Sequence, residues 1–369
     1  MRVLRIDESS RCQQLLGVGG LGTGIFFALE GNQTLGRNES RPGELLNVRD
    51  YCKLHIVIHY VAKLLGGQGF RVFPVGKVGD DQAGQFVLKE MNEAGIDTRF
   101  VEALADKPTL FSVCFQYPDG AGGNITTNNS AAAELSERDL AKTEDVLAAG
   151  PRTIALSVPE VSLEVRHEFL KLGTRTGAFR AASFVSAEIA AAKRLGMFEQ
   201  LDLISLNEAE AAELIGSDFS ADDPGRCMDK CMNYLRETYP HLHMVISCGR
   251  NGAYALNREV WSYCPVPQVE VASTAGAGDC LLGGILAAIA AGIPLLSARS
   301  PRQSLTERPL ESALEFGVLL ASYKVTSPHT IHPDASLSKL IEFAEQAKVQ
   351  FGPALSAVFT EAPLVRRTD

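Results

Sequence analysis

Four short apolar runs, separated from one another by segments long enough for a helix, are the feature that most constrains the fold of this chain. They comprise residues 153–158, 181–185, 203–206 and 244–247. Runs that are apolar throughout, rather than alternating with polar residues, are typical of strands buried on both faces. Strands that alternate with helices pair in parallel, so the pattern predicts an α/β fold with a doubly wound, mostly parallel sheet and helices on both faces.

The amino-terminal part of the chain extends this pattern and adds a candidate hairpin. Residues 14–20, which end in glycines, and residues 70–76 are two further predicted strands, and helical periodicity covers residues 51–65. Residues 110–117 alternate and residues 124–128 return after a Pro-Asp-Gly turn, which predicts a β-hairpin. A hairpin packed on its own domain is one interpretation, and the alternation alone does not decide what the hairpin covers.

A glycine-containing loop that leads into a long apolar helix is the first candidate for a functional site. Gly276 and Gly278 accept backbone angles closed to other residues and expose peptide N–H groups. The first N–H groups of a helix lack internal partners and the helix dipole adds positive charge, so a phosphate can bind there without a lysine. Asp279 is either an ordinary first-turn carboxylate or a base for a substrate hydroxyl. The dipole predicts a low pKa for it.

The run Thr274-Ala275-Gly276-Ala277-Gly278-Asp279 resembles the second signature of the ribokinase (PfkB-type) family of carbohydrate and nucleoside kinases. The resemblance implies that Asp279 is the catalytic base and that Gly276, Ala277 and Gly278 form an anion hole for the transferred phosphoryl group. It also implies ATP and Mg²⁺ as cofactors, and it allows for a monovalent cation. The acceptor is then a hydroxyl of a sugar or sugar-like small molecule.

Two further segments follow predicted strand ends, where ligands bind in sheets of this kind. Asn207 and Glu210 are ordinary helix-start residues in one interpretation. By their resemblance to the family's Asn-x-x-Glu motif they bind the cofactor, with Glu210 holding Mg²⁺ through water. Ser247, Gly249 and Gly252 form either a hairpin turn or, by resemblance, the turn that lies against the nucleotide phosphates.

Candidate substrate contacts lie in the amino-terminal third of the chain. Thr23 and Gly24 stand where the family has an aspartate that binds substrate hydroxyls. Residues 31–50 are polar, and Arg37 and Asn38 are either ligand contacts or part of a solvated loop.

Two more segments bear on the substrate. Gly79 and Asp80 lie in a run that resembles the family's first signature, although Asp80 or Asp81 as a helix cap is the alternative. On the predicted helix at residues 51–65 the family carries two glycines and an asparagine. This chain has other residues at those places, Cys52, Lys53 and Val57. These departures put the identity of the substrate in question rather than the reaction.

The resemblance also implies a domain organisation. It places one kinase domain over residues 12–335, with lid strands drawn from about 36–50 and 108–130, and a C-terminal helix and tail over residues 336–369. Such a lid covers the sugar and can pair with the lid of a second subunit in a homodimer. Residues 265–270 are expected to form a strand, and the polar segment 295–310 is expected on the surface.

Charge and cysteine content indicate which partners and which compartment suit this chain. A net charge of -9 argues against a nucleic-acid surface and against anionic membranes, because both need clustered Lys and Arg. The eight cysteines are scattered without a dense framework, which favours thiols in a reducing compartment. The first residues lack a signal-peptide core and the longest apolar stretch is too short for a bilayer, so we expect a cytoplasmic protein.

The sequence therefore predicts an ATP-dependent kinase with an alcohol group as acceptor. Asp279 would assist in-line phosphoryl transfer to a sugar or a sugar-like molecule. Two alternatives stay open at this point. The first is a nucleoside kinase, and the second is a catalytically silent nucleotide-binding relative of the family.

Overall fold

The computed structural model describes residues 2–6, 10, 12–119, 122–218, 223–297 and 302–362. Within these residues a 9-stranded sheet forms the centre of the molecule. In chain order its strands are β2 (Gln14–Val18), β5 (Arg71–Gly79), β6 (Val101–Leu104), β9 (Thr153–Ser157), β10 (Phe179–Ser183), β11 (Leu203–Asn207), β12 (His243–Ser247), β13 (Ala253–Leu256) and β14 (Trp261–Cys264). In space the order is β14-β13-β12-β11-β10-β9-β2-β5-β6.

The strands from β12 to β6 pair in parallel, and β13 is antiparallel to both of its neighbours. The predicted mostly parallel α/β sheet is therefore confirmed. Side chains alternate between the two faces, as strand geometry requires. Leu203 and Val245 join one core cluster, whereas Ile204 and Met244 join a second cluster on the opposite face.

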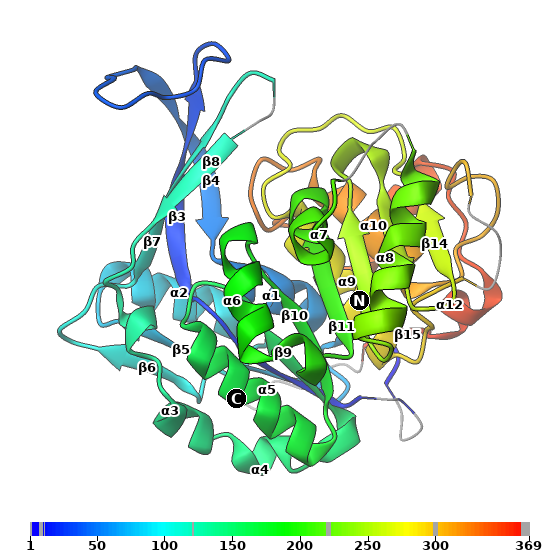
Figure 1. The fold of residues 1–369 in the computed structure, drawn as a ribbon, viewed down its shortest axis with the longest axis horizontal. Coiled ribbons are helices and arrows are strands. Elements are labelled where there is room, and N and C mark those ends of the chain that lie inside the picture. The colour runs from blue at the N-terminus through cyan, green and yellow to red at the C-terminus, as the bar shows by residue number, and fades with distance from the viewer. Residues whose placement is uncertain are drawn as a thin grey trace.

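Helices cover both faces of this sheet (Figure 1). One face is packed by α1 (Lys53–Leu65), α2 (Gln82–Glu93), α9 (Ala277–Ala290), α10 (Ala313–Lys324) and α11 (Leu337–Gln346). The other is packed by α3 (Glu137–Ala141), α4 (Glu144–Leu147), α5 (Leu163–Thr176), α6 (Ser186–Leu195), α7 (Glu208–Ile215) and α8 (Pro224–Thr238). Apolar strands buried from both sides are what this double covering demands.

A second, smaller sheet stands out from the body beside β5 and α2 (Figure 1). It consists of β3 (Gly22–Leu29), β4 (Gly43–Tyr51), β7 (Leu110–Gln116) and β8 (Gly122–Thr126) in the order β4-β3-β7-β8. The antiparallel pairing of β7 with β8 confirms the predicted hairpin. We call this sheet the lid sheet. The last part of the polar segment 31–50 belongs to strand β4, which ends at Tyr51, so α1 begins two residues later than the periodicity predicted.

Close contact between α1, α9 and α10 fixes the geometry of the site. A Cβ added to Gly283 of α9 would lie 2.8 Å from the carbonyl oxygen of Val57 in α1. A Cβ added to Gly284 would lie 3.0 Å from the Cα of Gly317 in α10. Glycine at these two positions lets the helix axes approach more closely than larger residues allow. The amino-terminal ends of α1 and α9 consequently meet.

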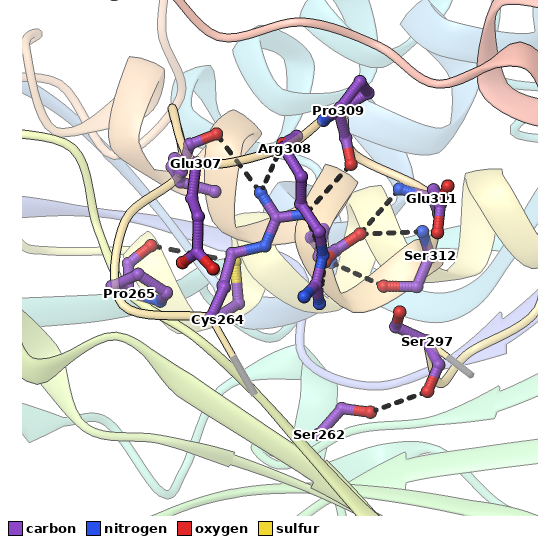
Figure 2. A network of polar contacts seen from close by, with 12 residues as sticks. Ser262, Cys264, Pro265, Ser297, Glu307, Arg308, Pro309, Glu311 and Ser312 are labelled. Atoms are coloured by element: carbon purple, nitrogen blue, oxygen red, sulfur yellow. Dashed lines mark hydrogen bonds and ion pairs between the residues drawn. The ribbon is translucent and has the colours of Figure 1, made fainter. Parts of the chain in front are cut away.

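The segment that leads into α10 was expected on the surface, but its central arginine is buried. Arg302 has almost no exposed area and pairs with Glu315, with 2.7 Å between the nearest nitrogen and oxygen. Its guanidinium also donates to the carbonyls of Leu305, Arg308 and Pro309. Glu315 in turn accepts from the backbone N–H groups of Glu311 and Ser312, which Figure 2 labels. The burial is possible because the charge of the arginine is paired. Arg302 therefore fastens this segment onto the start of α10.

The remaining β-strands and α-helices of the described residues lie near the chain ends. Strand β1 (Arg2–Leu4) pairs with β15 (Phe359–Glu361), which follows α12 (Pro353–Ala357). Residues 265–270 do not form the expected strand, since β14 ends at Cys264 and the chain continues as coil. The predicted C-terminal tail beyond residue 362 lies outside the described residues.

All eight cysteines lie within the described residues and are thiols rather than disulfides, as predicted. Seven of them are buried, which agrees with their apolar sequence neighbours. No helix in the described part of the chain is both long and apolar enough to cross a membrane.

Candidate active site

The amino-terminal end of α9 has the geometry of an anion site. Gly276 precedes the helix with a φ of 75°, in the left-handed region. A Cβ there would also lie 2.8 Å from the carbonyl oxygen of Thr330, so position 276 requires glycine twice over. The N–H of Ala277 already donates to the carbonyl of Thr274 at 3.1 Å. The N–H groups of Gly278 and Asp279 are therefore the better placed donors for an anion.

One cavity of about 680 Å³ opens beside this helix end. It gathers six of the residues that the sequence singled out, namely Asn207, Ser247, Gly249, Gly252, Ala277 and Gly278. Apolar side chains of α10 and of the coil after β14 form its other wall, including Val318, Val325 and Val266. The cavity thus has one end rich in hydrogen-bond donors and one apolar end. That division suits a ligand that carries phosphates and a flat apolar ring.

Asn207 and Glu210 bind each other across the start of α7. The Asn207 side-chain oxygen accepts from the Glu210 N–H at 2.9 Å, and the Glu210 carboxylate accepts from the Asn207 N–H at 2.8 Å. This reciprocal capping box fixes the Glu210 carboxylate at the end of β11. Burial raises the pKa of Glu210, and Asn207 and Lys53 oppose that shift. The capping interpretation and the ligand interpretation are therefore compatible.

The Glu210 carboxylate is the candidate protein ligand for a magnesium ion. The described residues contain no cluster of three or more His, Cys, Asp or Glu side chains that could hold a metal by themselves. Mg²⁺ commonly binds through one carboxylate, several waters and the phosphates of a nucleotide rather than in an all-protein cage. A single carboxylate that is hydrogen-bonded to Asn207, which lines the cavity, fits that mode.

Asp279 lies in the first turn of α9, and its side chain is 13% exposed. Its carboxylate oxygen is 3.8 Å from the ammonium of Lys53, the first residue of α1. Burial raises the pKa of Asp279, while Lys53 and Lys324 partly offset the rise. The low pKa predicted from the helix dipole is therefore wrong, because desolvation outweighs the dipole at this position.

Glu160 completes a charged cluster that the sequence motifs did not reveal. It follows the end of β9, and its carboxylate accepts the backbone N–H of Lys53 at 3.2 Å. Burial raises the pKa of Glu160 to about 7. Its φ of 77° is unusual for a residue other than glycine, so the chain holds Glu160 here at a cost of backbone strain. The one signal in the sequence was its position two residues after the predicted parallel strand at residues 153–158. Lys53 stood out in the sequence only as a departure from the family.

The predicted substrate residues lie on or near the lid sheet rather than in the cavity. Thr23 and Gly24 belong to β3, opposite Tyr51 and Asp50 of β4. A Cβ on Gly24 would lie 2.2 Å from the Asp50 carboxylate, so the acidic group at this place comes from the neighbouring strand. Arg37 and Asn38 lie in the exposed loop between β3 and β4. Neither of these two lines the cavity beside α9.

The segment around Gly79 and Asp80 connects α2 to the lid sheet. Asp81, not Asp80, caps α2, and its carboxylate accepts from the N–H groups of Gly84 and Thr109, each at 2.8 Å. A Cβ on Gly79 would lie 2.5 Å from the Lys107 carbonyl oxygen, which explains the glycine. Asp80 itself is exposed. This turn therefore anchors the first residues of β7.

Comparisons with known proteins agree with this geometry. The family model described as pfkB family carbohydrate kinase matches residues 60–337. Fructokinase-1 of Oryza sativa subsp. japonica is 26% identical over 298 residues, which cover 77% of this chain and 85% of the relative. The ribokinase of Dictyostelium discoideum is 23% identical over 263 residues, or 68% of this chain and 77% of the relative.

Solved structures share the fold. The ribokinase from Cryptococcus neoformans var. grubii serotype A in complex with ADP superposes with a TM-score of 0.72 at 20% identity, over 89% of this chain and 99% of that one. The ribokinase from Giardia lamblia gives a TM-score of 0.70 at 15% identity, over 93% and 99% of the two chains. The fold is therefore ribokinase-like, with a small lid sheet in which β4–β3 and β7–β8 are antiparallel pairs and β3–β7 is a parallel pair.

Proposed function

Because this chain belongs to the pfkB family of carbohydrate kinases, we propose that it transfers the γ-phosphoryl group of ATP to a hydroxyl of a sugar or sugar-like molecule. Family membership makes it a phosphotransferase with an alcohol group as acceptor. The observation that carries the proposal is the Asp279 carboxylate at the amino-terminal end of α9. It lies beside a large cavity, with Lys53 3.8 Å away.

The nucleotide would occupy the cavity with its phosphates toward α9. The Ser247 hydroxyl and the N–H groups of Gly249, Gly278 and Asp279 are suitable donors for phosphate oxygens. The apolar wall from α10 would receive the base. Donors fixed before the reaction can stabilise the charge that spreads over the moving phosphoryl oxygens, a contribution of about 3 kcal/mol per donor in comparable sites.

Asp279 would act as the base. As the acceptor oxygen forms its bond to the γ-phosphorus, the bond to the bridging oxygen of ADP breaks, and the hydroxyl proton passes to the Asp279 carboxylate. A pKa raised by burial makes Asp279 a stronger base than an exposed aspartate. The loose transition state of phosphoryl transfer needs little proton removal until late, so a carboxylate is sufficient.

Lys53, held in place by Glu160, would favour the ionised form of the Asp279 carboxylate. The Lys53 ammonium favours the ionised form of Asp279, and Asp279 in turn raises the pKa of Lys53. Glu160 holds the backbone N–H of Lys53 and so fixes where α1 begins. The position of the Lys53 charge beside Asp279 therefore depends on Glu160.

Glu210 would hold Mg²⁺ through water, with Asn207 fixing its carboxylate. When bound, the ion supplies positive charge to the phosphates of the nucleotide. The lid sheet would cover the acceptor and exclude water, which limits wasteful ATP hydrolysis.

The lid sheet also supports a proposal for assembly. Its outer strands are β4 and β8, and both carry exposed apolar side chains, Leu45 at 59% and Ile125 at 70% exposure. Exposed edges and apolar side chains favour pairing with another chain. We propose that two copies pair through their lid sheets to form a homodimer.

The test of the function is ADP release by the purified chain with MgATP over a panel of acceptors. Fructose and ribose come first, because fructokinases and a ribokinase are among the relatives, followed by other sugars, polyols and nucleosides. We expect turnover with at least one sugar or polyol, and loss of it in Asp279→Asn. Turnover with nucleosides alone would select a nucleoside kinase. ATP binding without turnover on any acceptor would identify a silent relative.

A further inference from the structure

A buried lysine lies beneath the loop that leads into α9. Lys324, in the last turn of α10, has no exposed area. Its ammonium donates to the carbonyl oxygen of Ser273 at 3.0 Å. No carboxylate in the described residues lies within ion-pair distance of it. The positive charge is therefore directed at the loop backbone, and the mechanism above does not use it.

We infer that Lys324 is a positioning residue whose ammonium holds residues 273–279, the anion loop, in its phosphoryl-binding shape, so that the enzyme needs no added monovalent cation. This inference rests on the proposed function. It concerns a group that neither the family resemblance nor the sequence pattern singled out.

The end of α10 and the start of the anion loop are joined at several points. The N–H groups of Ala272 and Ser273 donate to the Val325 carbonyl at 2.8 and 3.2 Å. The Ser273 hydroxyl accepts from the N–H of Ala275 at 3.2 Å, and Gly276 packs against Thr330. Only a few residues separate Lys324 from the N–H groups of Gly278 and Asp279, so a displacement of Lys324 would also displace those donors. Donors that stabilise a transition state must be fixed before the reaction, and such a displacement would weaken them.

Several surrounding groups favour a positive charge at this point. The carboxyl-terminal end of α10 carries partial negative charge, which favours a cation in its last turn. The titratable groups whose charges interact with Lys324 are Asp50 on β4, Asp279 and Cys280 on α9, and His329 and His332 after α10. Both Lys53 and Lys324 lower the pKa of Asp279, so both favour the ionised form of the proposed base.

The burial of Lys324 is costly for the fold. Desolvation lowers the pKa of Lys324 to about 8, which means that the folded chain disfavours the charged form. A neutral side chain of similar length would avoid that cost. Backbone carbonyls such as that of Ser273 are also the groups that K⁺ or Na⁺ would bind. Here the Lys324 ammonium already donates a hydrogen bond to the Ser273 carbonyl oxygen. The positive charge at this place therefore belongs to the protein itself rather than to a bound ion.

The first experiment uses the wild-type chain alone. Turnover is measured at equal ionic strength in potassium, sodium and tetramethylammonium chloride, so that screening is constant. We expect kcat to agree within about twofold, because the resident ammonium supplies the charge. Saturable activation of about fivefold or more by K⁺ or Na⁺ would overturn the inference, since it would reveal a cation site that Lys324 does not replace.

The second experiment compares Lys324→Met, Lys324→Ala and a control at an exposed lysine, Lys89→Met. We expect kcat to fall about 100-fold in Lys324→Met, as for loss of one preorganised donor. Its melting temperature should stay no more than about 2 °C below wild type. Ammonium or methylammonium should restore part of the activity of Lys324→Ala. A kcat within about threefold of wild type in folded Lys324→Met would contradict the inference.

A binding measurement separates this inference from the proposed function. Calorimetry with a non-hydrolysable ATP analogue and with ADP needs no acceptor and no turnover. We expect Lys324→Met to bind the triphosphate analogue about tenfold more weakly and ADP as wild type does, because the anion loop receives the γ-phosphate. Equal triphosphate affinity would overturn the role of Lys324. A wild-type chain that binds the analogue yet phosphorylates no acceptor would overturn the proposed function instead.

Discussion

The ammonium of Lys53 lies 3.8 Å from the carboxylate of Asp279, although 226 positions separate the two residues in the chain, 279 minus 53. The contact exists because α1 and α9 pack closely at Val57 and Gly283, which brings their first turns together. It places a fixed positive charge beside the proposed base. A change at either residue should therefore alter the chemistry of the other.

Replacing Lys53 by Met should slow phosphoryl transfer and shift its pH dependence. The ammonium lowers the pKa of Asp279, so its loss should raise that pKa further and move the acid limb of kcat/KM to higher pH. We expect kcat to fall about 10- to 100-fold, the range typical of a group that assists proton transfer. Lys171→Met, on the exposed surface of α5, is the matched control. An unchanged profile would exclude a role for Lys53.

The pH profile of the wild-type enzyme should be bell-shaped. The pKa of Glu160 is raised to about 7 by burial, so Glu160 gains a proton as the pH falls through that value, and Asp279 follows. The pKa of Lys324 is lowered to about 8, so its charge is lost as the pH rises through that value. The rate should therefore decline on both sides of roughly pH 7 to 8. In Glu160→Gln the rate should be lower at every pH, because glutamine resembles the protonated Glu160, and the remaining acid limb should report the titration of Asp279 alone. A profile flat from about pH 6 to 9 would contradict this assignment.

Gly276→Ala should destabilise the chain, whereas Gly278→Ala should not. Position 276 has a φ of 75° and a Cβ there would approach the Thr330 carbonyl to 2.8 Å. Position 278 has open space around an added Cβ and no left-handed backbone angle. We expect the free energy of unfolding to drop by about 1–3 kcal/mol for the first variant and by less than about 0.5 kcal/mol for the second. Chemical denaturation measures both. Equal effects would show that the loop relaxes around the added methyl group.

These outcomes depend on features that the sequence revealed to very different degrees. The strands from β9 to β12 were predictable because each is a short run buried on both faces. Asn207 was visible because it lies at the end of a predicted strand, and Asp279 was visible because it follows a glycine-containing loop at the start of a helix. The contact between Lys53 and Asp279 was not, since it arises from the packing of two helices at glycines. Local rules also failed where burial decided the outcome. The helix dipole predicted a low pKa for Asp279, but desolvation raises that pKa. The polar segment around Arg302 was expected on the surface, but pairing with Glu315 allows Arg302 to be buried.

Assembly through the lid sheet is tested by light scattering on the purified chain. We expect the mass of two chains, and a shift toward one chain in Leu45→Glu and Ile125→Glu, because a buried carboxylate at an apolar edge contact costs several kcal/mol unless paired. Val260→Glu, which changes an exposed apolar residue between β13 and β14 of the main sheet, is the control. A wild-type mass of one chain at all concentrations tested would rule out this dimer.

Magnesium dependence tests the place of Glu210. Glu210→Gln keeps the shape of the capping box but removes the charge that would hold the ion through water. We expect the Mg²⁺ concentration for half-maximal activity to rise about tenfold or more, with a smaller change in the melting temperature. Glu213→Gln, further along α7, is the matched control. An unchanged Mg²⁺ requirement would place the ion elsewhere.

Removal of the acceptor proton by Asp279, at the start of α9, is the step on which the proposed reaction depends. Single-turnover phosphoryl transfer from bound ATP, measured in the wild-type chain and in Asp279→Asn with the best acceptor, isolates that step. Asparagine keeps the size of the side chain, so triphosphate binding should persist while the transfer rate falls by about 100-fold or more. A transfer rate in Asp279→Asn close to that of the wild type would show that Asp279 is not the base, whatever the other variants do.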